Sequence, residues 1–423
     1  MAWPAVRLCT GASMPLLGLG TSRARQNDCY QAVKTALDIG YRHFDTAEIY
    51  QNEKDIGRAL QENFAVGLKR ETVFVTSKLW MTRHHPDDVL PACQSSLTDL
   101  GLDYLDLYLM HFPVAYARGD NFLPCDDKGQ RVTLDLHFME TWQAMENLVD
   151  AGLAKAIGVS NFNISQMEEV LTNGRLKPAV NQVESHPYLG CHRLLEYCTA
   201  KGVVMTAFCP IARPGTTGVM VRVRIRFTVH QAVSSFEKNR RAALEEKRSR
   251  GKNCTVTAPT PESSFPCSRC GRVCRSRVGW SNPPPEGVHQ TSEEAEQYGV
   301  GSLLSDPVIT EISKTHGKTP AQVCLKWQVQ RNVVVIPKSV TPARIKENSQ
   351  LFDFELSEDE MSAVNKLDKN GRLMWVWAVL FSKRLPWVRD YPETLDPDRT
   401  RKLVKVRLPK KICSAGNRWS PPK

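Results

Sequence analysis

The 423-residue chain is longer than a single barrel of about 250 residues requires, and its 41% of hydrophobic residues can fill a large core. No stretch approaches the roughly 20 apolar residues of a membrane-spanning helix, and no basic segment followed by an apolar one opens the sequence. We therefore expect neither a membrane protein nor a secreted one. The cysteines number thirteen, an odd count, and we expect them to be reduced thiols in the cytoplasm.

Two segments carry the net charge of +11. Residues 214–300 have a net charge of +6 and residues 401–423 one of +8, which leaves −3 for the remainder. The basic character therefore belongs to two appendages, and it does not indicate that the whole protein binds nucleic acid.

Short apolar runs alternate with amphipathic stretches from residue 6 onward. Residues 6–9 and 14–19 predict a small hairpin that leads into the first strand. The later runs are rich in β-branched and aromatic residues and almost continuously hydrophobic, as is typical of parallel strands covered on both faces. We predict these further strands at 41–45, 73–78, 105–111, 154–159, 179–183, 203–208 and 333–337.

Between these runs, apolar residues recur three or four positions apart, as in Ile56, Leu60 and Phe64, which predicts helices. Residues 319–322, Thr-Pro-Ala-Gln, have the pattern of a capping box with proline at the first helical position. Eight strands that alternate with helices predict an α/β protein with a (β/α)8 TIM barrel and an N-terminal β-hairpin. An open doubly wound sheet is the alternative, because alternation alone does not close a barrel.

Residues 214–300 interrupt this alternation, since the seventh and eighth predicted strands begin 130 residues apart. The segment is basic and rich in Pro, Ser and Thr, a composition that buries little apolar area. We therefore predict a barrel domain of residues 1–213 and 301–397, a basic and largely disordered insertion at 214–300, and a basic tail at 398–423.

Three polar residues each end an apolar strand: Asp45, Lys78 and His111. In a parallel barrel all strand ends meet at the carboxyl rim, where active sites lie. Tyr50 follows Asp45 by five residues, in the loop above the same strand. A buried ammonium beside a phenol favours the phenolate, an aspartate balances the ammonium, and a histidine can orient a carbonyl. Together the four predict carbonyl reduction with Tyr50 as the acid.

Each of these residues alone also has an ordinary structural explanation. A strand-end lysine or aspartate commonly forms a surface ion pair, a histidine is commonly a satisfied polar residue, and a tyrosine commonly serves packing. Their mutually consistent positions at strand ends favour a shared site.

Seven segments resemble the aldo-keto reductase family, and they cover essentially the whole chain outside the insertion and tail. Residues 82–89 and 116–122 are most similar to its aldehyde reductase branch, the NADP-dependent alcohol dehydrogenases. The resemblance implies NADPH-dependent reduction of small-molecule aldehydes, by a monomer, with Tyr50, Lys78, Asp45 and His111 as catalytic residues. The segments are MPLLGLGT (14–21), GYRHFDTAEIYQNE (40–53), VTSKLW (75–80), LDYLDLYLMHFP (102–113), KAIGVSNFN (155–163), PAVNQVESHPYL (178–189) and VVVIPKSVTPARIKEN (333–348).

The resemblance also implies where the cofactor would bind. Ser160, Asn161 and Gln182 would bond the nicotinamide carboxamide, and Phe208 would stack on its ring where the family usually has tyrosine. The chain contains no G-x-G-x-x-G with a ribose-binding acid, so a Rossmann mode is not supported. The remaining cofactor positions, at the 2′-phosphate, the adenine and the rim, are Thr21, Ser22, Asp45, Lys338, Ser339, Val340, Thr341, Arg344, Glu347 and Asn348.

The chain departs from the family at the expected substrate pocket. Ser22 and Phe112 each replace a usual tryptophan, while Trp80 is retained, which predicts a wider pocket of different shape. Arg389 is a candidate for binding a substrate carboxylate. Residues 209–213, Cys-Pro-Ile-Ala-Arg, replace a segment that covers the cofactor pyrophosphate in the family, so weakened NADPH binding is an open alternative.

The insertion supplies the alternative function, a catalytically impaired barrel whose basic insertion and tail bind nucleic acid. Cys267 and Cys270 have the spacing of half a zinc site, but no second pair follows at a suitable distance, so we predict no metal site. Nucleic acid is therefore the less favoured partner.

Overall fold

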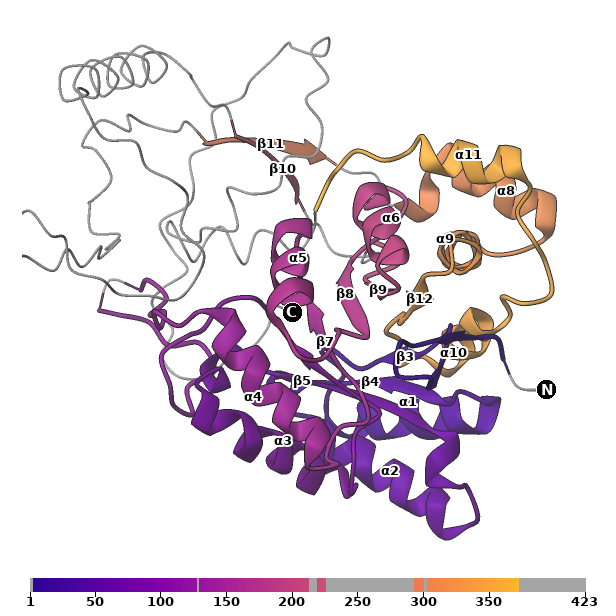
Figure 1. Cartoon of the computed structure of the whole chain (residues 1–423). Helices are drawn as coiled ribbons and strands as arrows, with labels where there is room; N and C mark the ends of the chain where they lie inside the picture. Colours follow the sequence, from indigo (N-terminus) through magenta and orange to yellow (C-terminus); the bar gives the residue numbers. More distant parts are fainter. Residues whose placement is uncertain (1–2, 128, 213–218, 226–292, 300–302, 373–423) are drawn as a thin grey trace, which may run out of the picture. The chain divides into compact units, whose positions relative to one another are not determined.

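The computed structural model describes residues 3–127, 129–212, 219–225, 293–299 and 303–372 (Figure 1). The chain divides into two compact units, one of residues 1–222 with 295–423 and one of residues 223–294. The first unit contains the predicted barrel. The predicted tail and Arg389 lie outside the described residues.

Eight parallel strands of the first unit form one sheet. Hydrogen bonds also join its first and last strands: the Gly18 amide donates to the Val335 carbonyl, and the Val335 amide to the Leu16 carbonyl, both at 2.8 Å. The sheet therefore closes into a barrel, which confirms the predicted fold and excludes the open sheet. In the order of the sheet, the strands are β12 (Val334–Val335), β9 (Val204–Phe208), β8 (Val180–Glu184), β7 (Ile157–Ser160), β6 (Leu107–Met110), β5 (Phe74–Leu79), β4 (His43–Asp45) and β3 (Leu19–Gly20).

Helices lie around the outside of these strands (Figure 1). They are α1 (Gln26–Ile39), α2 (Glu53–Ala65), α3 (Pro86–Leu100), α4 (Phe138–Asp150), α5 (Ile164–Asn173), α6 (His192–Ala200), α8 (Pro307–His316), α9 (Pro320–Gln330), α10 (Pro342–Ser349) and α11 (Glu358–Asn365). Short 3-10 turns are η1 (Glu48–Tyr50), η2 (Arg70–Thr72), η3 (Met81–Arg83) and η4 (Leu303–Ser305).

Local sequence signals set several helix ends. Thr319 and Gln322 form a complete capping box at the start of α9, and Pro320 occupies its first turn. Gly40 ends α1 in the left-handed region, with φ of 113°, and its amide donates to Ala36 and Leu37 carbonyls. The predicted start of α9 is confirmed.

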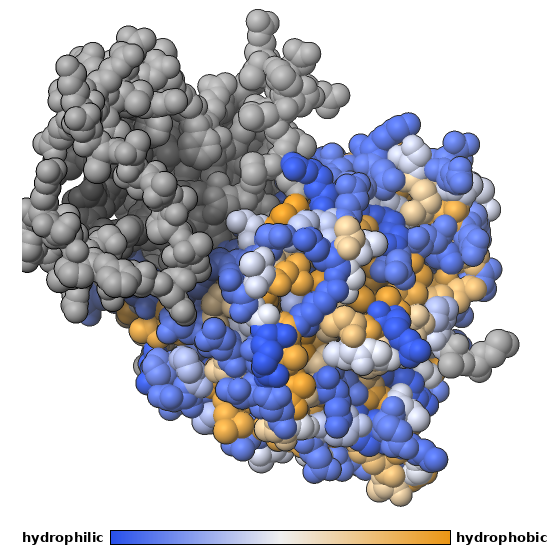
Figure 2. Space-filling view, in the orientation of Figure 1, coloured by the Kyte–Doolittle hydropathy of each residue, from blue (hydrophilic) through white to orange (hydrophobic). Residues whose placement is uncertain are grey.

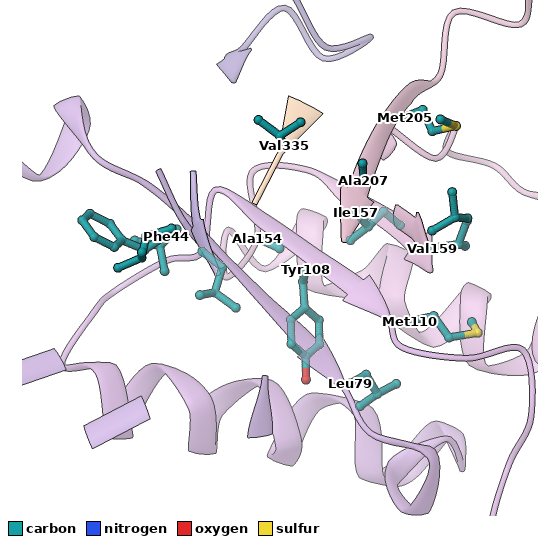
Figure 3. Packing of buried hydrophobic residues seen from close by; sticks show 14 of the residues in the cluster. Phe44, Leu79, Tyr108, Met110, Ala154, Ile157, Val159, Met205, Ala207 and Val335 are labelled. Atoms are coloured by element: carbon teal, nitrogen blue, oxygen red, sulfur yellow. The ribbon is translucent and has the colours of Figure 1, made fainter. Parts of the chain in front are cut away.

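Successive side chains of a barrel strand point to opposite faces of the sheet and so belong to two different buried layers. In β6, Tyr108 and Met110 face the helices, whereas Leu107 and Leu109 belong to a separate cluster. Figure 3 shows Tyr108 and Met110 within the layer between sheet and helices, together with Phe44 and other strand residues. This large layer fixes the strands whose ends carry the candidate site.

The second cluster gathers the other face of the strands with the N-terminal hairpin. Strands β1 (Ala5–Arg7) and β2 (Ser13–Pro15) pair antiparallel, as predicted. Leu8 and Met14 from the hairpin are buried in the same cluster as Phe74, Leu107 and other residues near the beginnings of barrel strands. The hairpin therefore covers the amino-terminal end of the barrel and leaves the carboxyl rim to the site.

Two segments of the predicted insertion are described. Strands β10 (Val219–Ile225) and β11 (Glu293–Gly299) form a two-stranded sheet, which is compatible with the predicted, largely disordered insertion. Val, Ile and Arg alternate from Val221 onward in β10, and such alternation is the pattern of a strand. The remaining insertion, including Cys267 and Cys270, lies outside the described residues.

Hydrophilic and hydrophobic residues both appear on the surface of the described part of the barrel. Figure 2 shows hydrophilic residues over most of its visible face, with smaller hydrophobic areas between them. No helix within the described ranges has the length and apolar character needed to cross a bilayer. Eight cysteines among the described residues form no disulfide, and Cys29, Cys93, Cys198 and Cys324 are buried as small apolar side chains.

Candidate active site

Asp45 and Lys78 meet at the carboxyl rim. The Lys78 ammonium lies 2.5 Å from Asp45 Oδ1 and also donates to the Thr46 carbonyl at 2.7 Å. Both side chains are almost fully buried, and parallel pairing of β4 with β5 brings them together across 33 positions of sequence. Burial lowers the pKa of Lys78, and the carboxylate of Asp45 opposes that shift.

Gln182 completes this arrangement from the far side of the barrel. Its amide nitrogen donates to Asp45 Oδ2 at 2.8 Å, so the two carboxylate oxygens have different partners. Gln182 lies on β8, which pairs with β7 next to Ser160. Hydrogen bonding of both oxygens fixes the orientation of Asp45 and hence the position of the Lys78 ammonium.

Tyr50 lies above the ammonium. Lys78 Nζ is 5.3 Å from the centroid of the Tyr50 ring, which ends η1 directly after β4. The sequence predicted that this ammonium would lower the pKa of Tyr50. In the structure burial raises the pKa of the phenol strongly, the Asp45 carboxylate raises it further, and only the Ser22 side chain opposes them. The net shift is therefore upward and follows from burial of the phenol. The predicted effect of Lys78 on this pKa stays a prediction.

His111 faces the phenol edge-on. The two ring centroids are 5.9 Å apart at an interplanar angle of 84°. Burial holds the pKa of His111 well below its usual range, and the nearby Lys78 lowers it further, so the imidazole is neutral at pH 7. Its buried Nδ1 has no hydrogen-bond partner among the described residues. A neutral imidazole beside a phenol can bond a polar group such as a carbonyl oxygen.

Aromatic side chains form the wall beside His111. Phe112 stacks on the imidazole with centroids 5.3 Å apart, and Trp80 meets it edge-on at 5.1 Å. The Trp80 indole donates to the Phe122 carbonyl at 2.7 Å, which anchors the loop after β6 to this wall. Two of the three predicted substrate residues therefore lie beside the catalytic candidates, and Arg389 is not described.

The predicted nicotinamide residues lie on neighbouring strand ends. Ser160 Oγ donates to the Gln182 carbonyl at 2.7 Å, and Asn161 Nδ2 donates to the His111 carbonyl at 2.9 Å. Asn161 has a φ of 63°, in the left-handed region, which turns its side chain back toward the rim. Phe208 ends β9 and is half-buried. These four residues and His111 therefore lie at the carboxyl ends of β6 to β9.

A second polar group follows β12. Lys338 and Arg344 are exposed, and Ser339 Oγ accepts the Thr341 amide at 3.2 Å, just before α10 begins at Pro342. The Tyr41 hydroxyl donates to the Ile345 carbonyl at 2.9 Å and holds α10 on the barrel. Two cations and a hydroxyl at a helix start are the donor set that fits a phosphate.

The other residues predicted at the adenine end line this helix. Val340 is half-buried against the core, the Glu347 carbonyl accepts a bond from Gln322, and Asn348 is buried. Gly20 and Lys338 form a parallel β-bridge between their backbones. A Cβ on Gly20 would lie 2.6 Å from the Ile336 carbonyl oxygen. The last strand therefore approaches the first closely enough to place this group on the same rim.

Residues 209–213 follow β9, at the place where the family has a segment that covers the cofactor pyrophosphate. Cys209 and Ala212 have positive φ values of 49° and 54°, and the Ala212 amide donates to the Cys209 carbonyl. The chain turns sharply here, and Arg213 lies outside the described residues. The predicted effect on NADPH binding stays a prediction.

Sequence reasoning missed Asn52. Its buried amide donates to the Thr21 carbonyl at 2.9 Å and to the Ala24 carbonyl at 3.0 Å, which fixes the rim loop after β3. Its position two residues after Tyr50, in Tyr-Gln-Asn-Glu, was the available signal. The described residues contain no group of His, Cys, Asp or Glu side chains placed to hold a metal ion.

The fold and this rim define an oxidoreductase barrel, and comparison with known proteins agrees. The model of the Aldo/keto reductase family matches residues 8–369, and the chain belongs to this family. Its relatives include aldo-keto reductase family 1 member A1 of Gallus gallus, 40% identical over 92% of this chain and 95% of the relative. The Homo sapiens protein of the same name is 38% identical over 93% of this chain and 98% of the relative.

A solved structure agrees with the fold. The aldose reductase from Schistosoma japonicum superposes with a TM-score of 0.69 and 33% sequence identity, over 92% of this chain and all of that chain. Carbonyl reduction is the activity that the family and these relatives support. Aldo-keto reductases use NADH or NADPH and act on small carbonyl compounds, so the chain is an oxidoreductase of that kind.

Proposed function

We propose that the chain reduces aldehydes to alcohols, with NADPH as the reductant and Tyr50 as the acid. The observation that carries the proposal is the buried Asp45–Lys78 pair, at 2.5 Å, beneath a phenol that faces a neutral imidazole.

The protein residues would divide the work as follows. The His111 imidazole bonds the carbonyl oxygen and turns it toward Tyr50. Tyr50 Oη gives its proton to that oxygen as negative charge develops on it. Lys78, held by Asp45, stabilises the phenolate that remains. The aromatic wall of Trp80 and Phe112 excludes water from this step.

Bound NADPH would supply the hydride to the carbonyl carbon. Ser160, Asn161 and Gln182 would hold the nicotinamide carboxamide and Phe208 its ring, with Thr21, Ser22 and Asp45 at the rim. The far end of the cofactor would lie along β12 and α10, with Lys338, Ser339 and Arg344 at the 2′-phosphate. The residues proposed beside them are Val340, Thr341, Glu347 and Asn348.

The domain division, with a barrel of residues 1–213 and 301–397, is likewise proposed. So are a monomeric state and a cytoplasmic location. Nucleic-acid binding by the insertion and tail gains no support from the family comparisons, and it rests on residues outside the described ranges.

Tyr50→Phe tests this function. The variant keeps the ring and its packing but has no proton to give, so NADPH oxidation with a simple aldehyde falls to background. Quenching of intrinsic fluorescence by NADPH is retained, because the phenol hydroxyl makes no proposed cofactor bond. Undiminished turnover in Tyr50→Phe would reject the assignment, and absence of NADPH quenching in the wild-type chain would reject the cofactor.

A further inference from the structure

A short turn, residues 47–51, carries Tyr50 above the end of β4. Within it the Tyr50 amide donates to the Ala47 carbonyl at 2.9 Å. Thr46 lies directly before the turn and Asn52 directly after it, and both residues are buried. The Thr46 hydroxyl donates to the Asn52 side-chain oxygen at 3.3 Å. The two flanking side chains therefore tie the base of the turn together.

Asn52 also fastens this turn to the loop after β3. Its side-chain nitrogen donates to the Thr21 carbonyl at 2.9 Å and to the Ala24 carbonyl at 3.0 Å. The amide therefore uses both of its hydrogens and its oxygen, each on a different residue. Because Asn52 is only 1% exposed, bulk water does not replace these bonds when they are lost.

Thr46 connects the same turn to the Lys78 ammonium. Lys78 Nζ donates to the Thr46 carbonyl at 2.7 Å, and the Thr46 amide donates to the Thr76 carbonyl of β5 at 2.8 Å. One residue thus holds the ammonium with its carbonyl and the base of the turn with its hydroxyl. The 5.3 Å between Lys78 Nζ and the centroid of the Tyr50 ring depends on the backbone between Thr46 and Asn52.

We propose that Asn52 is a positioning residue for the reaction: its three hydrogen bonds fix the turn so that Tyr50 stays above the Lys78 ammonium and delivers its proton to the carbonyl oxygen. The proposal rests on the proposed function. In the step, the Tyr50 O–H bond breaks and an O–H bond forms on the substrate oxygen, while the carbonyl carbon receives the hydride from NADPH. The phenolate that remains needs the ammonium at a fixed distance, because their attraction falls with separation.

Asn52→Ala and Thr46→Val test this in the full chain. Asn52→Ala removes all three bonds, whereas Thr46→Val removes only the bond across the base and keeps the carbonyl that binds Lys78. Thr206→Val is the matched control, because Thr206 is a buried residue of β9 whose hydroxyl has no hydrogen-bond partner among the described residues. With saturating NADPH and aldehyde, we expect kcat to fall about tenfold in Asn52→Ala and about threefold in Thr46→Val, since small displacements of a reacting group are costly, and to stay unchanged in Thr206→Val.

Two enzymatic readouts separate positioning from a loss of stability. NADPH binding, followed by fluorescence quenching, keeps the wild-type Kd, because Thr21 keeps both of its bonds to the Asp45 carbonyl, at 3.1 and 2.9 Å. The solvent deuterium isotope effect on kcat rises in both variants, because proton delivery by Tyr50 becomes slower relative to the other steps. Lower stability alone reduces the amount of active protein and leaves this isotope effect unchanged.

Carbon-13 NMR of chains labelled at tyrosine Cζ measures the surroundings of the phenol without turnover. The Tyr50 resonance is assigned by its disappearance in Tyr50→Phe. We expect it to shift in Asn52→Ala and in Thr46→Val, and to keep its position in Thr206→Val.

The outcomes separate the two proposals. An unchanged kcat and an unchanged Tyr50 resonance in Asn52→Ala would overturn the role of Asn52, as would a fall in kcat with an unchanged solvent isotope effect. Weaker NADPH binding with unchanged kcat would assign Asn52 to the cofactor loop and overturn it as well. If Asn52→Ala does not fold, the isosteric Thr46→Val decides by the same criteria. Undiminished turnover of Tyr50→Phe would instead reject the proposed function, and the resonance would still report whether Asn52 holds the phenol in place.

Discussion

Glu53 makes the stability of this barrel depend on pH. Its carboxyl is buried at the start of α2, where Oε1 accepts the Ser77 hydroxyl at 2.5 Å and Oε2 the Ser96 hydroxyl at 2.9 Å. No cation bonds it directly among the described residues. Burial raises the pKa of Glu53 to about 7, the carboxylates of Glu48 and Asp99 add to the rise, and the two hydroxyls oppose it.

Glu53→Gln removes this titration and preserves the shape of the side chain. In the unfolded chain a glutamate titrates near 4.5, so the folded state binds the proton more tightly. The resulting stabilisation is fully present below pH about 4.5 and is lost as pH rises through about 7. The shift in pKa corresponds to about 3 kcal/mol at alkaline pH, since each unit is worth about 1.4 kcal/mol.

The assay is denaturant unfolding of the wild type and Glu53→Gln at pH 5 and pH 8. We expect the free energy of unfolding of the variant, relative to the wild type, to rise by about 2–3 kcal/mol between these pH values. Glu71→Gln, at an exposed glutamate, is the matched control. If the difference between Glu53→Gln and wild type stays constant with pH, the proton on Glu53 has no such role and the reasoning fails.

Two further substitutions test the rim and the packing of the helices. Asp45→Asn leaves the buried Lys78 without its counter-charge. We expect the free energy of unfolding to fall by about 3 kcal/mol and the reductase activity to be lost. An unchanged free energy of unfolding would show that the ion pair contributes little to stability. Gly57→Ala places a Cβ 2.6 Å from the Leu100 carbonyl oxygen, so α2 must move away from the end of α3. We expect the free energy of unfolding to fall by about 1–3 kcal/mol. An unchanged melting temperature would contradict this close approach of the two helices.

The sequence predicts most of the barrel because its signals are local. Strand composition, capping boxes and the glycine after α1 each act within a few residues, and the strand ends then place Asp45, Lys78 and His111 on one rim. Closure of the barrel cannot be predicted in this way, because it depends on backbone hydrogen bonds between residues 16–18 and Val335, which are far apart in the sequence. No local pattern encodes these bonds, and the open sheet therefore stayed an alternative.

The roles at the rim are less predictable from residues alone. Ser160 and Asn161 would pass for a helix cap, but the structure gives that role to Asn163, whose side chain accepts the Gln166 amide. The family resemblance was needed to single out the first two. The direction of the shift in the Tyr50 pKa could not be predicted from sequence either, because it depends mainly on how completely the fold buries the phenol.

In the proposed reaction, a phenol above a buried ammonium–carboxylate pair delivers a proton to a carbonyl. Its most direct test follows NADPH absorbance and alcohol formation together, in the full chain and in Lys78→Met. We expect the wild type to form one alcohol for each NADPH it oxidises, and the variant to show neither process. Equal rates in the two proteins, or alcohol formation that does not depend on NADPH, would contradict it.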